Sequence, residues 1–372
     1  MKRKRVPLAK YITEYSVRNK SNEDIPVYSV TNSQGFCTDY FDKEVASKDK
    51  KTYKVVPRGY FAYNPSRINV GSVDWQKFEE KVIVSPLYNV FSVSENMEQQ
   101  YLYYFLKSDI GRQMIKTKVF GSVRDNLKIE MLKEMTIPER TVEEQKKCVS
   151  ILDTLQRTIS LRNKELSELN ILIRARFVEM FGDIQSEEKY KNIKLKEICN
   201  TVSGGTPSTR VKEYYNGEIP WITTVSLGDN YINGVGAKAY ITKSAIDNSA
   251  TKLIPAGNIL FGTRVGVGKS SINMVDLCTN QDIVAIIDID TNKFDRLFIK
   301  HVLDMNQPYY DSLKKGATIL GITSEDLKDT IIPNVPIEVQ NKFSEFVIVI
   351  DKSKLLAISQ PQIHIYKTLT LL

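Results

Sequence analysis

The part of this sequence that comes closest to enzyme chemistry is the glycine-rich stretch GTRVGVGKS at residues 262–270. It ends with glycine, lysine and serine in succession, as a phosphate-binding Walker A loop does. Such a loop also needs a glycine five places before Gly268, because the backbone N–H groups between the two glycines surround the phosphates, and Thr263 stands there. The spacing is wrong by one residue, so the sequence predicts no nucleotide bound in this way.

Two other segments contain part of the chemistry of DNA-modifying enzymes. Asn-Pro at residues 64–65 begins like the motif of amino-methyltransferases, but the Ser and Arg that follow supply no aromatic ring for a flipped base. Asp183 and the glutamates at 187–188 could form a nuclease carboxylate set, yet they lie in a polar stretch where solvated charges are ordinary. There is no GxGxxG motif, and four scattered cysteines with two histidines favour neither a zinc site nor a disulfide framework. The sequence therefore predicts no catalytic residue and no metal.

Other residues combine cations with glycines, which suits a polyanionic partner. Arg264 and Lys269 flank two glycines, and Arg67 stands at the matching place in the first half of the chain. Arginine is the commonest side chain to recognise guanine, through a two-pronged hydrogen bond. An ordinary surface arginine is an equal alternative for each one singly, but one in each half favours function. The loop SGGTP at 203–207 exposes backbone N–H groups that suit phosphate, with an ordinary tight turn as the alternative, and Trp221 is more typical of a core.

The charge of the chain is compatible with DNA but unevenly distributed. The net charge is +8, and residues 1–140 contain 24 Lys and Arg against 17 Asp and Glu, whereas residues 186–335 contain 17 of each. Contacts made by the second half must therefore come from local arrangement. No apolar run approaches the ~20 residues that cross a bilayer, and no apolar stretch follows the N-terminal basic cluster. The expectation is a cytoplasmic protein with no membrane partner.

The sequence repeats itself once, at an offset of 195 residues. Between residues 121–147 and 316–342, nine of 27 positions are identical without a gap, which is the signature of an internal duplication. The identical pairs include the Ile-Pro steps at 137–138 and 332–333, and Gln145 with Gln340. Each half is therefore predicted to contain one mixed α/β domain, at residues 1–140 and 183–335.

A long helix is predicted after each domain, at residues 141–182 and 336–372. The first lacks Gly and Pro from Glu143 onward, and its apolar residues recur every seven positions, as in a coiled-coil seam. A helix packed only on its own domain is the alternative. Pro361 should kink or shorten the second helix. The predicted helix-pairing residues are Leu152, Leu155, Ile159, Leu166, Leu169, Ile173, Val347, Ile350, Leu355 and Ile358.

The predicted fold class is α+β, with two similar mixed α/β domains joined by two long antiparallel coiled-coil helices in a pseudo-twofold arrangement. A helix of ~40 residues is ~60 Å long, so such a pair would form a stiff rod with a domain at each end. Two binding sites at a fixed separation suit double-stranded DNA, where the spacing of half-sites then depends on the rod.

Together these features resemble the specificity subunits of Type I restriction–modification enzymes. The resemblance rests on the duplication, on the Ile-Pro step before each long helix, and on the order of segments LKEI at 195–198, SGGTP at 203–207, IPWIT at 219–223, PAG at 255–257 and FGTR at 261–264. It covers essentially the whole chain. It implies two target-recognition domains that read a split DNA target, two methylation subunits that bind S-adenosylmethionine, and ATP-dependent restriction subunits.

The resemblance also implies that this chain binds no cofactor, and that S-adenosylmethionine, ATP and Mg²⁺ belong to partner subunits. It places the segment before each Ile-Pro step near DNA, where lysines and an arginine would neutralise phosphates. The residues predicted to bind DNA are Tyr63, Asn64, Arg67, Arg124, Asn126, Ser203, Gly204, Gly205, Thr206, Thr223, Thr224, Arg264, Lys269, Lys314, Lys315 and Thr318.

Two other functions stay open from the sequence. One is a truncated or silent specificity subunit that acts only as a protein-interaction scaffold, which Pro361 motivates. The other is a DNA methyltransferase or nuclease with an unrecognised active site. The target sequence and its spacer are not predictable, because bases are chosen by a few side chains whose directions depend on loop geometry. Whether the host complex restricts or only methylates is not predictable either.

Overall fold

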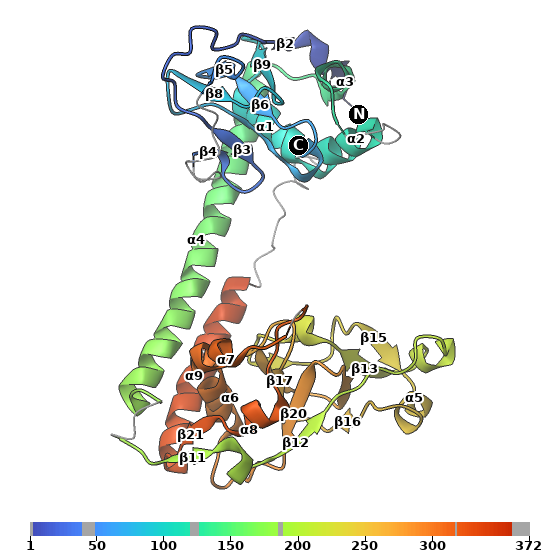
Figure 1. Ribbon diagram of the computed structural model, residues 1–372, viewed down its shortest axis with the longest axis vertical. Coiled ribbons are helices and arrows are strands. Elements are labelled where there is room, and N and C mark those ends of the chain that lie inside the picture. The colour runs from blue at the N-terminus through green and yellow to red at the C-terminus, as the bar shows by residue number, and fades with distance from the viewer. Residues whose placement is uncertain (1–2, 39–48, 120–125, 185–188, 317, 359–372) are drawn as a thin grey trace. The chain divides into compact units, whose positions relative to one another are not determined.

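The computed structural model describes residues 3–38, 49–119, 126–184, 189–316 and 318–358. These residues form two compact units that divide between Asn163 and Lys164, inside helix α4 (Val142–Phe181), and each unit combines short strands with helices (Figure 1). The prediction of two mixed α/β domains with a long helix after the first is therefore confirmed. No helix within these ranges has both the length and the apolarity needed to cross a membrane.

The first unit is built on a four-stranded antiparallel sheet. Its elements are β1 (Arg5–Pro7), η1 (Leu8–Lys10), β2 (Ile12–Glu14), β3 (Ser29–Thr31), β4 (Gly35–Cys37), β5 (Lys54–Pro57), β6 (Phe61–Tyr63), η2 (Ile68–Val70), β7 (Val73–Trp75), β8 (Lys81–Val84), β9 (Asn89–Val93), α1 (Gln99–Lys107), α2 (Asp109–Val119), α3 (Ile129–Glu134) and β10 (Thr136–Pro138). The sheet has the order β2-β9-β6-β7, and β1-β10, β3-β4 and β5-β8 form separate pairs. Stacked rings of Phe61 and Phe91, 5.0 Å apart, join its central strands in the core.

The second unit contains two larger sheets. Its elements are β11 (Asn192–Lys194), η3 (Leu195–Glu197), β12 (Asn200–Ser203), η4 (Lys212–Tyr215), β13 (Ile219–Ile222), η5 (Thr224–Ser226), β14 (Tyr231–Ile232), β15 (Ala239–Ile241), α5 (Lys243–Asp247), β16 (Leu253–Ile254), β17 (Ile259–Gly262), β18 (Ser270–Asn273), β19 (Leu277–Thr279), β20 (Ile283–Ile287), α6 (Arg296–Met305), α7 (Gln307–Leu313), α8 (Ser324–Lys328), β21 (Ile331–Pro333) and α9 (Ile337–Ile358). One sheet has the order β12-β20-β17-β18-β14 and the other β15-β13-β19-β16.

The repeated Ile-Pro step is a strand in both units. In the first unit β10 pairs antiparallel with β1, so that Ile137 lies opposite Val6. In the second unit β21 pairs antiparallel with β11, so that Ile332 lies opposite Ile193. Both isoleucines of the repeat are fully buried. The strand that precedes each long helix is thus paired with the first strand of its own domain.

A buried glutamine holds the first turn of α4 to its domain. The side-chain oxygen of Gln145 accepts a hydrogen bond from the backbone N–H of Glu98 (2.7 Å), the N-cap residue of α1. Its amide donates to the carbonyls of Asn96 and Arg140, both at 3.0 Å. The glutamine therefore satisfies three backbone groups at the place where two helices begin.

Gln340 makes the same arrangement in the second unit. Its oxygen accepts from the N–H of Asp295 (2.8 Å), the N-cap residue of α6. Its amide donates to the carbonyls of Lys293 (2.9 Å) and Val335 (2.7 Å). The sequence identity of the two glutamines therefore reflects an equivalent structural role in each half.

Replacing either glutamine by leucine should destabilise its own unit. Gln145→Leu or Gln340→Leu leaves a backbone N–H and two carbonyls without partners in a buried place, and each such group costs roughly 1–3 kcal/mol. Calorimetry should show a lower unfolding temperature, and hydrogen exchange should be faster in α1 for the first variant and in α6 for the second. The exposed Gln156 of α4 gives the matched control, and Gln156→Leu should change stability by less than ~0.5 kcal/mol. Equal effects of all three changes would contradict the proposed role.

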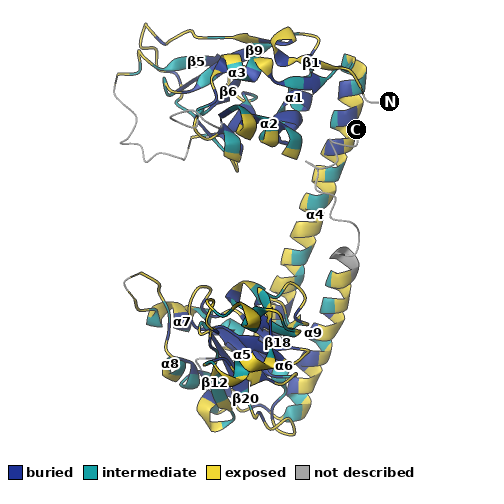
Figure 2. Ribbon diagram, turned by 90° about the vertical axis from the view of Figure 1, so that its right-hand side faces the viewer, coloured by how far each residue is buried: buried dark blue, intermediate teal, exposed yellow. Residues whose placement is uncertain are grey.

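Within the second unit, the C-terminal part of α4 packs antiparallel against α9 (Figure 1). The rings of Phe177 and Phe343 lie 5.4 Å apart, whereas Leu166 and Leu355, nearer the opposite ends of the two segments, line one cavity. The numbering therefore runs in opposite directions along the pair. Figure 2 shows the buried stripe on α9 that results. Of the predicted pairing residues, Ile173, Val347 and Ile350 are buried in this shared core, with Leu169 partly buried against it.

The other predicted pairing residues have different positions. Leu152 is fully buried against Tyr104 of α1, and Leu155 and Ile159 pack beside it. The first half of α4 therefore packs on its own domain, because α1 presents a tyrosine face to this part of the helix, and the pairing of these three residues with the second helix stays a prediction. Leu166 is only partly buried and Leu355 is exposed. The side chain of Ile358, and residues 359–372 with Pro361, lie outside the described part of the chain.

Candidate nucleic-acid interface

The loop after β12 is held closely by its neighbours in the second unit. The N–H of Gly205 donates to the carbonyl of Thr279 (2.8 Å), and the indole N–H of Trp221 donates to the carbonyl of Gly205 (2.9 Å). Trp221 itself is buried, as its residue type suggested. A Cβ atom on Gly204 would lie only 2.3 Å from the carbonyl oxygen of Asn280, so glycine is required there. The loop is therefore fixed, with Ser203 and Thr206 exposed.

The end of β13 adjoins this loop. The N–H of Asn280 donates to the carbonyl of Ile222 (3.1 Å), so the segment after β19 lies between the two. Thr223 is half-buried and precedes η5. Thr224 is buried, and its methyl group lies 3.5 Å from the place where a Cβ on Gly262 would stand. Thr224 therefore packs inside the domain against the end of β17. This burial corrects the prediction that it contacts DNA.

The loop between β17 and β18 comes next. The N–H of Thr263 donates to the carbonyl of Asp282 (2.8 Å), which joins this loop to the segment after β19. Val265 has a φ of 28°, a strained conformation for a β-branched residue. Arg264 and Lys269 are exposed, and neither makes an ion pair or side-chain hydrogen bond with any residue that the structure describes.

The segment 315–321 lies against that loop. Lys315 and Gly321 donate backbone hydrogen bonds to each other, at 2.9 and 3.0 Å, which closes residues 316–320 into a tip. The N–H of Ile322 donates to the carbonyl of Thr263 (2.9 Å), and Gly321 forms a β-bridge with Arg264. The exposed Lys315 thus pairs with the same Gly321 that bridges Arg264, and Thr318 is exposed in the tip between Lys315 and Gly321.

These segments form a continuous set of loops, which we call the loop edge: residues 203–206, 222–224, 263–269, 279–282 and 315–321. Most of the predicted DNA-binding residues of the second unit lie on it. Thr206 is tied to the edge by a hydrogen bond from its hydroxyl to Gln281 (2.6 Å). Lys314, just outside it, is paired with Asp311, and this ammonium group lowers the pKa of the carboxyl. The exposed cations Arg264, Lys269 and Lys315 outnumber Asp282, the carboxylate of the edge, so the edge has a local positive charge that the neutral second half does not have as a whole.

Residues 280–282 were not among those predicted to lie at a binding surface. Asn280, Gln281 and Asp282 connect the loop after β12 to the loop after β17, and they do so chiefly through backbone groups. A polar triplet between two buried strands, β19 and β20, is the signal that could have indicated an edge loop.

The first unit has the same junction between its two corresponding segments. The N–H of Leu127 donates to the carbonyl of Pro65 (3.0 Å), as that of Ile322 does to Thr263 (2.9 Å). Leu127 and Ile322 are 195 residues apart, the offset of the repeat. The loop after β6 and the segment before α3 are therefore joined as their counterparts are in the second unit.

The predicted DNA-binding residues of the first unit are of two kinds. Some are buried and position a loop, and others lie at the surface. Tyr63 is fully buried, and its hydroxyl donates to the carbonyl of Leu127 (3.0 Å) and accepts from Asn89 (2.9 Å). Burial raises the pKa of this hydroxyl, so it stays a neutral hydrogen-bonding group. Tyr63 therefore positions the loop, which corrects the prediction that it contacts DNA. Arg67 is exposed, Asn64 in the loop after β6 and Asn126 before α3 are half-buried, and Arg124 lies outside the described residues.

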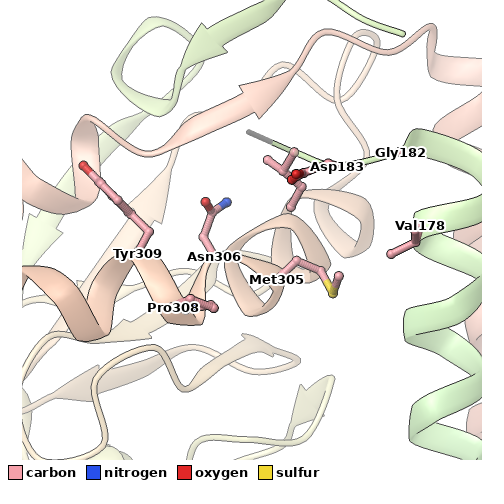
Figure 3. Close-up of a pocket in the computed structure, with 8 residues that line it drawn as sticks. Val178, Gly182, Asp183, Met305, Asn306, Pro308 and Tyr309 are labelled. Atoms are coloured by element: carbon pink, nitrogen blue, oxygen red, sulfur yellow. The ribbon is translucent and has the colours of Figure 1, made fainter. Parts of the chain in front are cut away.

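The cavities of the second unit lie elsewhere. One of about 510 Å³ lies between α4 and the α6–α7 corner, where Val178 and Met305 face each other across it (Figure 3). Another of about 680 Å³, between α4, α6 and α9, is lined in part by His301, whose pKa is lowered by burial and by nearby cations. Burial raises the pKa of Cys278 to about 11 and that of Cys199 to about 12. These groups are therefore neutral at pH 7, and no cluster that could hold a metal ion occurs among the described residues.

Comparison with known proteins gives a consistent result. A sequence profile described as the Type I restriction modification DNA specificity domain matches residues 6–170 and 187–363. The Type I restriction enzyme MjaIX specificity subunit of Methanocaldococcus jannaschii is 32% identical over 152 residues, which are 41% of this chain and 35% of that protein. The EcoR124I/EcoR124II specificity subunit of Escherichia coli is 27% identical over 298 residues, which are 75% and 69% of the two chains. The match thus spans about a third of the MjaIX subunit and about two thirds of the other.

Two solved structures share the fold over nearly the whole chain. One is from work on complex assembly and conformational transition of the type I R-M system, with a TM-score of 0.57 and 15% identity over 99% of this chain and 94% of that one. The other is the S subunit of a Type I restriction–modification system from M. genitalium, with a TM-score of 0.54 and 14% identity over 100% and 93%. At these low sequence identities, the similarity to the two structures shows a shared fold.

Proposed function

Because this chain belongs to the Type I restriction–modification DNA specificity family, we propose that each unit reads one half of a split DNA target with the loops joined at its repeated junction. The observation that carries the proposal is the shared hydrogen bond from Leu127 to Pro65 and from Ile322 to Thr263. It brings a loop with an exposed arginine against a second segment in each unit. In the second unit, this arrangement gathers unpaired cations and exposed backbone at one edge, as phosphate and base recognition require.

The proposed partners are double-stranded DNA, two methylation subunits and the restriction subunits. S-adenosylmethionine, ATP and Mg²⁺ are proposed to bind to those partner subunits. The complex is proposed to work in the cytoplasm, where the DNA is. Exposed apolar side chains on the helices, namely Ile171 and Val178, which are seven residues apart on α4, and Val349 of α9, support a protein partner on the helices. The chain itself is proposed to be non-catalytic, because the family that it matches is a DNA specificity domain and the thiols of Cys199 and Cys278 are protonated at pH 7.

A competition gel shift tests this function with the full chain bound to its methylation subunits. The duplex is the motif found by mapping N6-methyladenine in the host genome, and the competitor is random duplex of equal length. We expect the motif to bind more tightly by a factor of about 10³ or more, on the order found for specific DNA-binding proteins. Equal affinity for both would overturn the proposal and favour a scaffold. Methyl transfer or cleavage by the chain alone, with S-adenosylmethionine and Mg²⁺, would favour an enzyme.

Removing one unpaired cation of the loop edge should change the salt dependence of binding. Lys269→Ala and Lys315→Ala should each reduce the slope of log affinity against log salt by about 1, because each removes one phosphate neutralisation. The affinity for motif and random duplex should fall together. Lys243→Ala is the control, since this exposed lysine begins α5, beside β15 rather than the loop edge. An unchanged slope for both test variants would place the loop edge away from the phosphates.

A further inference from the structure

The tip of segment 315–321 presents an apolar pair to solvent. Ile319 is 56% exposed and Leu320 57% exposed, and Val265 of the adjoining loop is 54% exposed. Single exposed apolar residues are ordinary on protein surfaces, but several gathered on two hydrogen-bonded loops indicate a contact site.

The base of the tip is closely packed. The two backbone bonds between Lys315 and Gly321 close it at its base. A Cβ atom on Gly316 would lie 2.2 Å from the carbonyl oxygen of Ile319, and one on Gly321 would lie 2.8 Å from Cγ of Arg264. Both glycines are therefore needed for the close packing of this tip. The apolar pair thus lies directly next to a closely packed base.

The charges around the pair fit a polyanion. Arg264, Lys269 and Lys315 are exposed and have no side-chain partner among the residues described. The nearby carboxylates accept other hydrogen bonds: Asp311 from Lys314, Asp326 from the N–H of Thr323 at 2.8 Å, and Asp282 from the amide of Asn280 at 2.9 Å. Lys315 is close enough to Asp326 to lower the pKa of its carboxyl, but the two form no ion pair. An apolar partner protein would leave these cations without partners, whereas duplex DNA offers phosphates for the cations and base surfaces for the apolar pair.

The two halves of the chain differ at these positions. At the offset of 195, Ile319 corresponds to Arg124 and Leu320 to Asp125. The residues that frame the segment are matched, with Gly121 opposite Gly316 and Leu127 opposite Ile322. The two segments thus share their flanking residues, but one has charged residues where the other has apolar residues. Such a difference is expected if the two units recognise different bases.

We propose that Ile319 and Leu320 enter a groove of the target duplex and contact bases directly, by their methyl groups or beside a base step. Arg264, Lys269 and Lys315 hold the phosphates on either side. The pair would then determine specificity within one half of the target, which deepens the function proposed above and rests on it. Apolar contact recognises the thymine methyl group, and inserted Ile or Leu side chains recognise easily unstacked steps.

A selection experiment tests the pair. The full chain with its methylation subunits selects from a duplex library with a randomised segment, and the bound fraction is sequenced. We expect Ile319→Ser with Leu320→Ser to keep the preference in one half of the motif. At one or two base pairs of the other half, discrimination should fall about tenfold, within the range of one base-pair mismatch. The salt slope should stay as in the wild type, because no cation is removed.

Val235→Ser is the matched control. Val235 is 83% exposed and lies in a turn beside Pro220, at the other end of β13 from the loop edge, so this variant should select the wild-type motif. The conservative pair Ile319→Val with Leu320→Met should keep the preference that serine removes. If thymine is read through its methyl group, uracil at that position should weaken wild-type binding. If the two side chains instead insert beside a base step, uracil should have no effect, whereas stiff A-tracts should be rejected.

The outcomes separate the two proposals. If the wild type selects no motif, the proposed function fails. If the wild type selects a motif and the serine pair selects it with equal discrimination, the role of the apolar pair is overturned and the function stands. Loss of preference in both halves, together with a lower unfolding temperature, would show a structural role and would also overturn it.

Discussion

An Ile173→Asp variant is expected to lose ~2–5 kcal/mol of stability in the second unit, because it removes a buried apolar side chain from the core and puts a carboxylate in its place. Ile173 is 4% exposed and belongs to the core that α4 shares with α9, α6 and a sheet of the second unit. The charged groups of Arg174, Lys300 and Lys354 line the same cavity as Ile173, but they do not replace the apolar contacts that the variant loses. Calorimetry and hydrogen exchange should show unfolding of α9 at lower temperature, with loss of copurified methylation subunits.

Leu172→Asp provides the control on the same helix. Leu172 is 46% exposed, so its carboxylate would remain hydrated, and stability should change by less than ~0.5 kcal/mol. Leu166→Asp should give an intermediate loss, because this predicted seam residue is only partly buried. If Ile173→Asp unfolds at the wild-type temperature, the packing of α4 against α9 does not exist in solution.

A Gly204→Ala variant is expected to reduce affinity for the target by roughly tenfold to a hundredfold, the range of losing one or two base-pair contacts. The added Cβ would lie 2.2 Å from Oγ1 of Thr279 and 2.3 Å from the carbonyl oxygen of Asn280. Either the loop after β12 or the segment after β19 must move. Since that segment also holds the loop after β17, the displacement extends to Arg264. The gel shift with the mapped motif measures this loss.

Gly236→Ala is the matched control for this substitution. Its φ of 75° strains an alanine backbone, but the space around it is open, so no neighbour is displaced. It should cost ~1 kcal/mol of stability and leave the affinity for DNA unchanged. A loss of affinity in both variants would mean that the effect comes from general destabilisation. Wild-type affinity in Gly204→Ala would show that the loop after β12 is not part of the interface.

The duplication was predictable from sequence because it depends on short, local identities. The Ile-Pro steps and the two glutamines match at a fixed offset, and each has a local structural role, since the first forms a strand that closes the domain and the second holds the start of a helix. The heptad pattern predicted the long helix correctly. It could not tell which partner each apolar residue meets, since Leu152 and Ile173 are equivalent in the pattern yet pack on different surfaces.

Burial of single side chains was not predictable in the same way. Tyr63 and Thr224 have suitable polar groups and stand beside suitable neighbours in the chain, but both point inward. Tyr63 lies in strand β6, where successive residues alternate between faces, so a one-residue shift decides between surface and core, and the sequence does not determine that register. Thr224 begins the short helix η5, and its burial depends on the end of β17 that packs on it. Ile319 and Leu320 show the opposite case, since apolar residues were expected to be inside.

The sequence alone determined the two-domain α+β organisation, the long first helix and the resemblance to DNA specificity subunits, because these depend on periodicity and on repeated local motifs. Only the tertiary structure decided which loops meet at the edge of the second unit and which side chains remain exposed there. Those loops are 203–206, 263–269, 279–282 and 315–321, and they are joined by backbone hydrogen bonds between segments far apart in the chain. Backbone groups are the same in nearly every residue, so no residue pattern records which of them will pair.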